Sequence, residues 1–245
     1  MYNPQMAASA PTSGSVPRHA PLVRATHWIT AAAFAALLVT GVGILISHPR
    51  FYWGETGNAR MTPLFQFPIP ASRASVPTGY GYVLPDANGW GRYLHFQSAW
   101  VAVLTGLLYV IWGLAGGHFR RNLLPARGSV SWSRISAHLS LRRPGPEEAW
   151  SYNPVQRIVY LSVIFVLFPL VIWTGLAMSP GFVSALPLAV KLLGGQQSAR
   201  TLHFFVSAAL ALFALVHVGM VMLAGFRGRV RPMLTGRAAS KREGR

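Results

Sequence analysis

The chain has 245 residues, of which 52% are hydrophobic and only 11% are charged, and its mean hydropathy is +0.37. A soluble domain usually carries about a quarter charged residues, so this composition argues against a soluble enzyme, a disordered chain and a coiled coil. The chain contains no Cys, which excludes disulfides, thiolate metal sites, iron–sulfur ligation and covalent haem attachment through a Cys-x-x-Cys-His motif.

Four apolar segments are long enough to cross the hydrocarbon core of a bilayer, which takes about 20 helical residues. In chain order they are residues 22–46, 93–115, 154–178 and 199–225. The first is too long and begins too late to be a cleaved signal peptide. The sequence therefore predicts an all-α membrane protein, a bundle of four transmembrane helices, with a kink at Pro169 in the third.

The remaining segments divide into tails and loops. Residues 1–20 are predicted to be a disordered tail, 21–228 one transmembrane domain and 229–245 a basic tail, with disorder over the last 15 residues. Inside the domain, a long loop at about 47–92 joins the first two spans and another at about 116–153 joins the second to the third. The first loop is rich in Pro, Gly and aromatic residues, which favours an ordered cap or a docking surface.

The net charge of +17 is distributed like a topology signal. Sixteen of the 22 Lys and Arg residues lie on the side of the two tails and of the segment between the second and third spans, counting the ends of the adjoining spans, and six lie on the opposite side. The positive-inside rule therefore predicts that both termini are cytoplasmic. We interpret the charge as this signal, with some attraction to anionic lipid, and expect no nucleic-acid partner.

Four of the eight His lie inside apolar segments, where an ionisable side chain is costly and usually functional. Because successive spans run in opposite directions, His95 and His203 lie near the outer side and His27 near the inner side. His217 follows His203 by 14 residues, nearly four helical turns, so it lies on the same helix face about 21 Å further in. The sequence therefore predicts an outer pair, His95 with His203, and an inner pair, His27 with His217.

Two facing imidazoles at each of two depths suit haem better than other groups. Zinc takes more protein ligands or a bound water, and a proton relay is expected to include carboxylates, which the four segments lack. A low-spin haem b takes two axial His and no covalent link. One intramembrane His alone is as often a packing residue, but four in this arrangement predict two b haems.

Three of these His follow an Arg by one helical turn, and these residues are Arg24, Arg92 and Arg200. Residues three apart share a helix face, and the forked donors of Arg bind carboxylates such as haem propionates. The alternative interpretation is that the Arg side chains are anchors that reach the interface at helix ends.

Together these residues resemble a known family, the bacterial integral-membrane cytochrome b subunits of nickel–iron hydrogenases, formate dehydrogenases and thiosulfate reductases. The resemblance covers nearly the whole chain apart from the tails and the outer loop, and the long outer loop is most similar to the thiosulfate-reductase branch. It rests on Arg24…His27-Trp28, His95, the segment Tyr152-Asn153-Pro154-Val155-Gln156-Arg157, and the spacing of His203 and His217.

The resemblance implies a subunit of the bacterial cytoplasmic (inner) membrane that carries electrons between a periplasmic partner, of molybdenum or hydrogenase type, and the membrane quinone pool. The catalytic subunit would then be a separate chain. The resemblance also implies a quinone pocket near the inner haem, with Asn153 and Gln156 as contacts.

Other interpretations stay open at this stage. Asn153 before Pro154 also suits a helix cap and a first helical residue. A stand-alone quinone-linked haem b oxidoreductase, of superoxide or ferric reductase type, is the alternative function, and a non-redox scaffold or transporter is a third.

Overall fold

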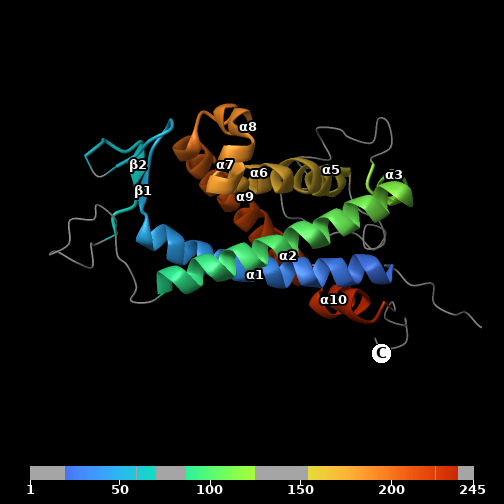
Figure 1. The fold of residues 1–245 in the computed structure, drawn as a ribbon. Helices are drawn as coiled ribbons and strands as arrows, with labels where there is room; N and C mark the ends of the chain where they lie inside the picture. Colours follow the sequence, from blue (N-terminus) through green and yellow to red (C-terminus); the bar gives the residue numbers. More distant parts are fainter. Residues whose placement is uncertain (1–19, 59, 70–86, 125–153, 224, 237–245) are drawn as a thin grey trace, which may run out of the picture.

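A computed structural model of the chain describes residues 20–58, 60–69, 87–124, 154–223 and 225–236. Within them, four helical spans are long and apolar enough to cross a membrane, which confirms the predicted all-α four-helix membrane fold (Figure 1). The spans are α1 (Pro21–Ser47), α2 (Ala87–Ala115), the segments α5 (Pro154–Ser162), η1 (Val163–Leu167) and α6 (Phe168–Leu176), and α9 (Gln196–Leu223).

The predicted ends of the spans lie within a few residues of the observed ends, except at the start of the second span. There α2 begins at Ala87, whereas the sequence places the start at residue 93. The helix continues into the polar segment 88–92, where water can satisfy the first backbone N–H groups. Hydropathy therefore marks the membrane-crossing part of this helix and not its end.

The third span, where the sequence predicts a kink at Pro169, contains a π-helical turn close to this proline. A π-helical turn, η1, ends two residues before this proline. Proline lacks the N–H that would bond the carbonyl four residues earlier, and that residue, Phe165, lies in η1. A local π turn changes the spacing of hydrogen bonds at such a position.

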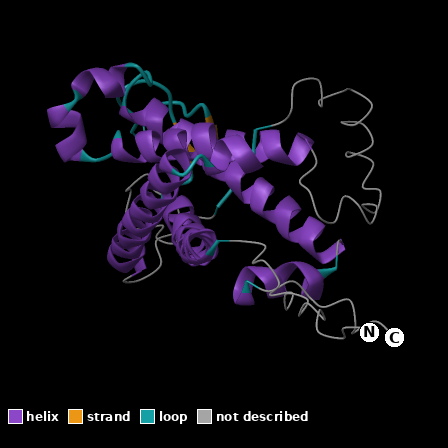
Figure 2. Cartoon of the chain, turned by 90° about the vertical axis from the view of Figure 1, so that its right-hand side faces the viewer, coloured by secondary structure: helices purple, strands orange, loops and turns teal. Residues whose placement is uncertain are grey.

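Smaller elements lie at the two ends of the bundle (Figure 1). At one end are the antiparallel strands β1 (Arg50–Phe51) and β2 (Phe65–Gln66) and the helices α7 (Pro180–Ala185) and α8 (Pro187–Lys191). The opposite end carries α3 (His118–Asn122) and α10 (Phe226–Thr235). Figure 2 looks onto this second end, with the strands behind the helices. By the charge prediction, the strands lie at the outer end and α3 and α10 at the inner end.

Two small apolar clusters join the spans. One cluster, centred on Val163, Val206 and Leu210, packs the third span against α9 and is contacted by Phe34 of α1. The other cluster joins the end of α6 to α8 and the start of α9, and its buried members are Ala177, Val190, Leu193 and Ala199. Many other large apolar side chains of the spans are exposed, as expected for helices that face lipid.

The C-terminal segment differs from the prediction. The last 15 residues, 231–245, are expected to be disordered, yet α10 continues to Thr235. The expectation is therefore wrong for residues 231–235. Residues 1–19 and 237–245, which carry the rest of the two predicted tails, lie outside the described part of the chain.

Two side chains at the start of α1 account for the order of α10. Arg24 donates a hydrogen bond to the carbonyl of Leu234 at 2.7 Å, and the Trp28 indole donates to the carbonyl of Met233 at 3.1 Å. A helix leaves its last four carbonyls without partners inside the helix. These two tertiary contacts supply hydrogen-bond donors to two of these carbonyls, those of Met233 and Leu234.

Candidate functional site

The predicted outer histidines lie together in the structure. His95, near the start of α2, and His203, near the start of α9, have ring centroids 6.4 Å apart, and their rings are inclined by 66°. The two residues come from different helical hairpins, so only the packing of the bundle brings them together.

The predicted inner histidines lie together in the same way. His27 of α1 and His217 of α9 have ring centroids 6.3 Å apart, and their rings are inclined by 55°. Since α9 supplies one member of each pair, its rise sets the separation of the two pairs along the bundle at about 21 Å.

Hydrogen bonds hold both outer imidazoles. The hydroxyl of Thr40 lies 2.9 Å from Nδ1 of His95, and the hydroxyl of Thr174 lies 3.1 Å from Nδ1 of His203. The carbonyl oxygen of Val171 lies 3.1 Å from the same His203 nitrogen. These contacts fix the orientation of each ring about its Cβ–Cγ bond.

A glycine follows each of these threonines and lies against the same ring. A Cβ atom built on Gly41 would lie 3.6 Å from Cε1 of His95, and one built on Gly175 would lie 3.3 Å from Cε1 of His203. The contact at Gly175 is tight and that at Gly41 is ordinary, so the absence of a side chain matters for the approach of the ring mainly at Gly175.

Aromatic rings surround the inner pair. Trp28 meets His27 edge-on at 5.1 Å, and Phe213 stacks on His217 at 5.7 Å with an angle of 23° between the rings. Tyr160 of the third span lies 6.2 Å from His217. Nδ1 of His27 is buried and has no hydrogen-bond partner within the described part of the chain.

The two outer arginines converge on one residue, His48, which directly follows α1. Arg92 lies 3.1 Å from Nε2 of His48, and Arg200 donates to the His48 carbonyl. Burial, followed by the charges of Arg200 and Arg92, lowers the pKa of His48 to about 4. The imidazole is therefore neutral at pH 7 and can lie between two cations. Arg200 also lies over the Phe51 ring, 5.1 Å from its centroid.

The described part of the long outer loop forms an ordered cap on the start of α9, in agreement with its aromatic composition. Thr201 donates to the carbonyl of Tyr52 at 2.7 Å, and the amide of Gly54 donates to the Ser198 hydroxyl at 2.8 Å. The amide of Gln197 donates back to the Gly54 carbonyl at 3.0 Å.

Aromatic rings of the two strands and of the residue after β2 pack on a ring of α9 and complete this cap. They form a cluster of closely spaced rings made of Phe51, Phe65, Phe67 and Phe204.

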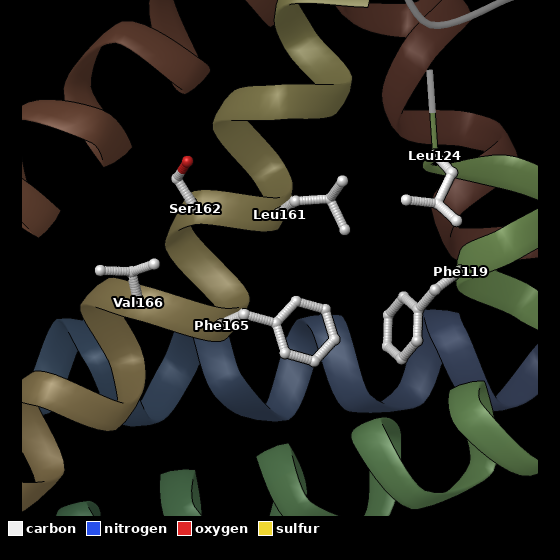
Figure 3. A pocket seen from close by; sticks show the side chains of 6 residues that line it. All are labelled: Phe119, Leu124, Leu161, Ser162, Phe165 and Val166. Carbon is white, nitrogen blue, oxygen red and sulfur yellow. The ribbon is translucent and has the colours of Figure 1, made fainter. Parts of the chain in front are cut away.

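The residues predicted to contact quinone lie at the start of the third span. Asn153 lies outside the described residues, and the partly buried Gln156 is in the first turn of α5. On the same span, an apolar pocket of about 520 Å³ opens between α3 and the third span (Figure 3). It is lined by Phe119, Leu124, Leu161, Ser162, Phe165 and Val166. Arg157 donates to the Leu124 carbonyl at 3.2 Å and joins these two parts of the chain.

The donor set of each pair fits a haem. Two imidazoles that share a metal at about 2 Å each, with about 1 Å from nitrogen to ring centre, have centroids roughly 6 Å apart. Among the described residues, no group of three His, Cys, Asp or Glu side chains could hold a metal ion. Each pair therefore suits a metal that brings its own equatorial ligands, as iron in a porphyrin does.

Sequence reasoning missed three residues of the outer site, namely Thr40, Thr174 and His48. A signal for the threonines is present, because the dipeptide Thr-Gly occurs in the first span and again in the third. The role of His48 has no comparable signal, since its contacts depend on how the cap folds over the helix ends.

Comparison with known proteins gives a family and two relatives. The family described as prokaryotic cytochrome b561 matches residues 18–236. A protein of Azospira oryzae named as a protein-methionine-sulfoxide reductase subunit, YedZ1, is 29% identical over 213 residues, which cover 84% of this chain and 90% of that protein. A protein of Cupriavidus necator named as a Ni/Fe-hydrogenase B-type cytochrome subunit is 26% identical over 225 residues, which cover 84% of this chain and 79% of that protein.

Proposed function

This chain belongs to the prokaryotic cytochrome b561 family and is a multi-pass membrane electron-transfer protein that uses haem b; we propose that it carries two such haems and connects a periplasmic redox partner to the membrane quinone pool. The observation that carries this proposal is the pair of imidazole couples, at 6.4 Å and 6.3 Å, at opposite ends of one helix. The membrane is then the bacterial inner membrane, because quinone and a periplasmic partner meet there.

The chain's own residues would hold and orient the two groups. His95 and His203 would be the axial ligands of the outer haem, and His27 and His217 those of the inner haem. When bound, a haem b supplies a one-electron centre whose potential depends on its axial ligands, their hydrogen bonds and its burial. The apolar spans separate the two centres from water.

The arginines are proposed to serve the charged edge of each haem. Arg92 and Arg200 lie one turn outside the outer ligands, and Arg24 lies one turn outside His27. Each already contacts a protein group, which fixes its position: the outer two contact His48, and Arg24 contacts the end of α10. A preorganised guanidinium binds a carboxylate with little loss of side-chain freedom.

The quinone is proposed to bind at the inner end, near Gln156 and the apolar pocket of Figure 3. Tyr160 lies on α5 one turn after Gln156, and its ring is 6.2 Å from that of His217. This segment therefore links the polar start of the third span to the inner histidine pair. Asn153 is a second proposed contact.

The partner is proposed to be a separate catalytic subunit on the outer side. The two named relatives are subunits of a reductase and of a hydrogenase, so both belong to multi-chain redox enzymes. The ordered cap over the outer end offers a preformed surface for such a subunit. The narrower likeness to the thiosulfate-reductase branch stays a prediction.

The decisive experiment is haem quantitation on the purified protein. We expect a reduced-minus-oxidised difference spectrum of b type and two haems per chain by pyridine haemochrome. One haem per chain would contradict the two-centre proposal, and no Soret absorption would favour a non-redox scaffold. Reduction of superoxide or ferric ion by the chain alone, with quinol as donor, would favour the stand-alone alternative.

A further inference from the structure

The outer site is built twice from the same short sequence pattern. The first hairpin carries Thr40-Gly41 on one span and Arg92-Tyr-Leu-His95-Phe96 on the next. The second hairpin carries Thr174-Gly175 and Arg200-Thr-Leu-His203-Phe204. Each Thr-Gly pair contacts the histidine of its own hairpin. The two halves of the outer site are therefore related as a duplicated unit.

The duplication extends to individual hydrogen bonds in the first half. The hydroxyl of Thr40 lies 2.7 Å from the carbonyl of Ala36 and 3.3 Å from that of Leu37, respectively four and three residues earlier on α1. The Leu37 carbonyl also lies near enough to the His95 imidazole to interact with it.

The second half repeats this arrangement on the third span. The hydroxyl of Thr174 lies 2.8 Å from the carbonyl of Leu170 and 3.1 Å from that of Val171, again four and three residues earlier. The Val171 carbonyl lies 3.1 Å from Nδ1 of His203. Both imidazoles thus contact a threonine hydroxyl and the carbonyl three residues before that threonine.

These contacts determine where the proton of each ring lies. A hydroxyl has one hydrogen, and each threonine donates it to the carbonyl four residues earlier, so its oxygen is left to accept from the histidine. A carbonyl can only accept, so Val171 requires an N–H at Nδ1 of His203. Each ring then has Nδ1 protonated and Nε2 free as a lone-pair donor.

We propose that Thr40 and Thr174 are positioning residues of the outer site, which fix His95 and His203 as the Nδ1–H tautomers and aim both Nε2 atoms at one shared iron. This inference rests on the proposed haem function. Metal-ligating histidines commonly donate the other N–H to such an acceptor, which fixes the ring and raises the basicity of the ligand. A more basic ligand stabilises the oxidised iron, so the two threonines lower the outer midpoint potential.

The test is a redox titration of full-length Thr40→Val and Thr174→Val proteins in membranes. Valine matches the shape of threonine and removes only the hydroxyl. We expect the outer midpoint potential to rise in each variant, further in the double variant, with the inner potential unchanged. The outer site should also lose haem roughly 10- to 100-fold more readily, the range found when such outer partners are removed. His203→Ala identifies which signal is the outer one.

Two matched variants separate positioning from simple packing. Thr40→Ser keeps the hydroxyl and should restore the wild-type potential. Thr26→Val removes a buried hydroxyl on the same helix, whose partners among the described residues are two carbonyls of that helix, Leu22 and Val23, and should leave the outer potential unchanged. The inner haem of each variant reports whether the chain has folded.

The possible failures are distinct. An unchanged outer potential in both valine variants, equal shifts of both haems, or no rescue by Ser would overturn the inference and leave the two-haem function standing. Absence of haem from the wild-type protein would overturn the proposed function itself.

Discussion

The two histidine pairs have nearly the same ring spacing but different surroundings. At the outer pair, threonine hydroxyls and main-chain carbonyls hold both Nδ1 atoms. At the inner pair, aromatic rings of Trp28, Phe213 and Tyr160 surround the imidazoles, and Nδ1 of His27 has no hydrogen bond to any described residue. Nearly the same ring spacing is therefore held by directional hydrogen bonds at the outer pair and by ring packing at the inner pair.

This difference has a physical consequence. A hydrogen bond restricts the rotation of an imidazole and also fixes its tautomer, whereas ring packing restricts rotation alone. The outer imidazoles are thus preorganised more fully than the inner ones. We expect the two proposed haems to respond differently to the same kind of mutation.

The largest expected effect comes from removing one ligand of each pair. His203→Ala should abolish outer haem binding and leave most of the inner haem, and His217→Ala should do the opposite, because each residue belongs to one pair only. Haem content by pyridine haemochrome should fall by about half in each. Equal loss of both haems in either variant would show that the two sites do not form independently.

A smaller effect is expected from adding a methyl group at each outer glycine. Gly175→Ala places a Cβ 3.3 Å from Cε1 of His203, a tight contact, whereas Gly41→Ala places one 3.6 Å from His95, an ordinary contact. Overpacking of this kind costs about 1–3 kcal/mol. Gly175→Ala should therefore weaken outer haem binding about tenfold or more, while Gly41→Ala changes it little, as measured by haem transfer to a high-affinity acceptor.

The matched control for both variants is Gly43→Ala. Its Cβ would have no atom within 4 Å, so the outer haem should not change. Ala is a better helix former than Gly by about 1 kcal/mol, so a loss seen only at Gly175 cannot come from helix propensity. Equal losses at all three positions would contradict the asymmetry between the two halves of the site.

The outer cap should loosen in acid. The folded protein keeps the pKa of His48 near 4, below its ordinary value of 6.5, so the unfolded cap binds more protons between these pH values. Stability of the cap is therefore complete above about pH 6.5 and falls as the pH drops toward 4. Hydrogen exchange of residues 48–54 should accelerate over this range.

His48→Gln provides the control for this pH dependence. Gln cannot titrate, so exchange in the cap should be independent of pH over the same range after correction for intrinsic rates. Retention of the full acid response in His48→Gln would show that another group is responsible.

The smallest effect is expected from the arginines. Arg200→Ala removes a cation beside the outer pair. The loss should disfavour the reduced form of the outer haem by about 0.2–1 kcal/mol, the range of partly exposed charge interactions, and so lower the outer midpoint potential with haem content retained. Arg24→Ala should leave the outer potential unchanged but release α10, because Arg24 bonds the Leu234 carbonyl. Redox titration measures the first effect, and proteolysis at the arginines of α10 measures the second.

The sequence by itself determined the four spans and the depth of each buried histidine. Both follow from local properties: hydropathy marks the segments that prefer lipid, and the fixed rise of a helix converts the 14-residue spacing of His203 and His217 into two levels. The depth match between spans was enough to predict which imidazoles lie together.

Only the tertiary structure decided what holds these residues. The contact of Thr40 with His95 spans 55 residues, and that of Arg200 with His48 spans 152, so neither follows from any local period. The same holds for α10, whose end is ordered by side chains at the start of α1. Helix formation and membrane crossing depend on short-range chemistry, whereas the tautomer of a ligand and the order of a cap depend on which distant atoms the packed bundle brings within hydrogen-bond distance.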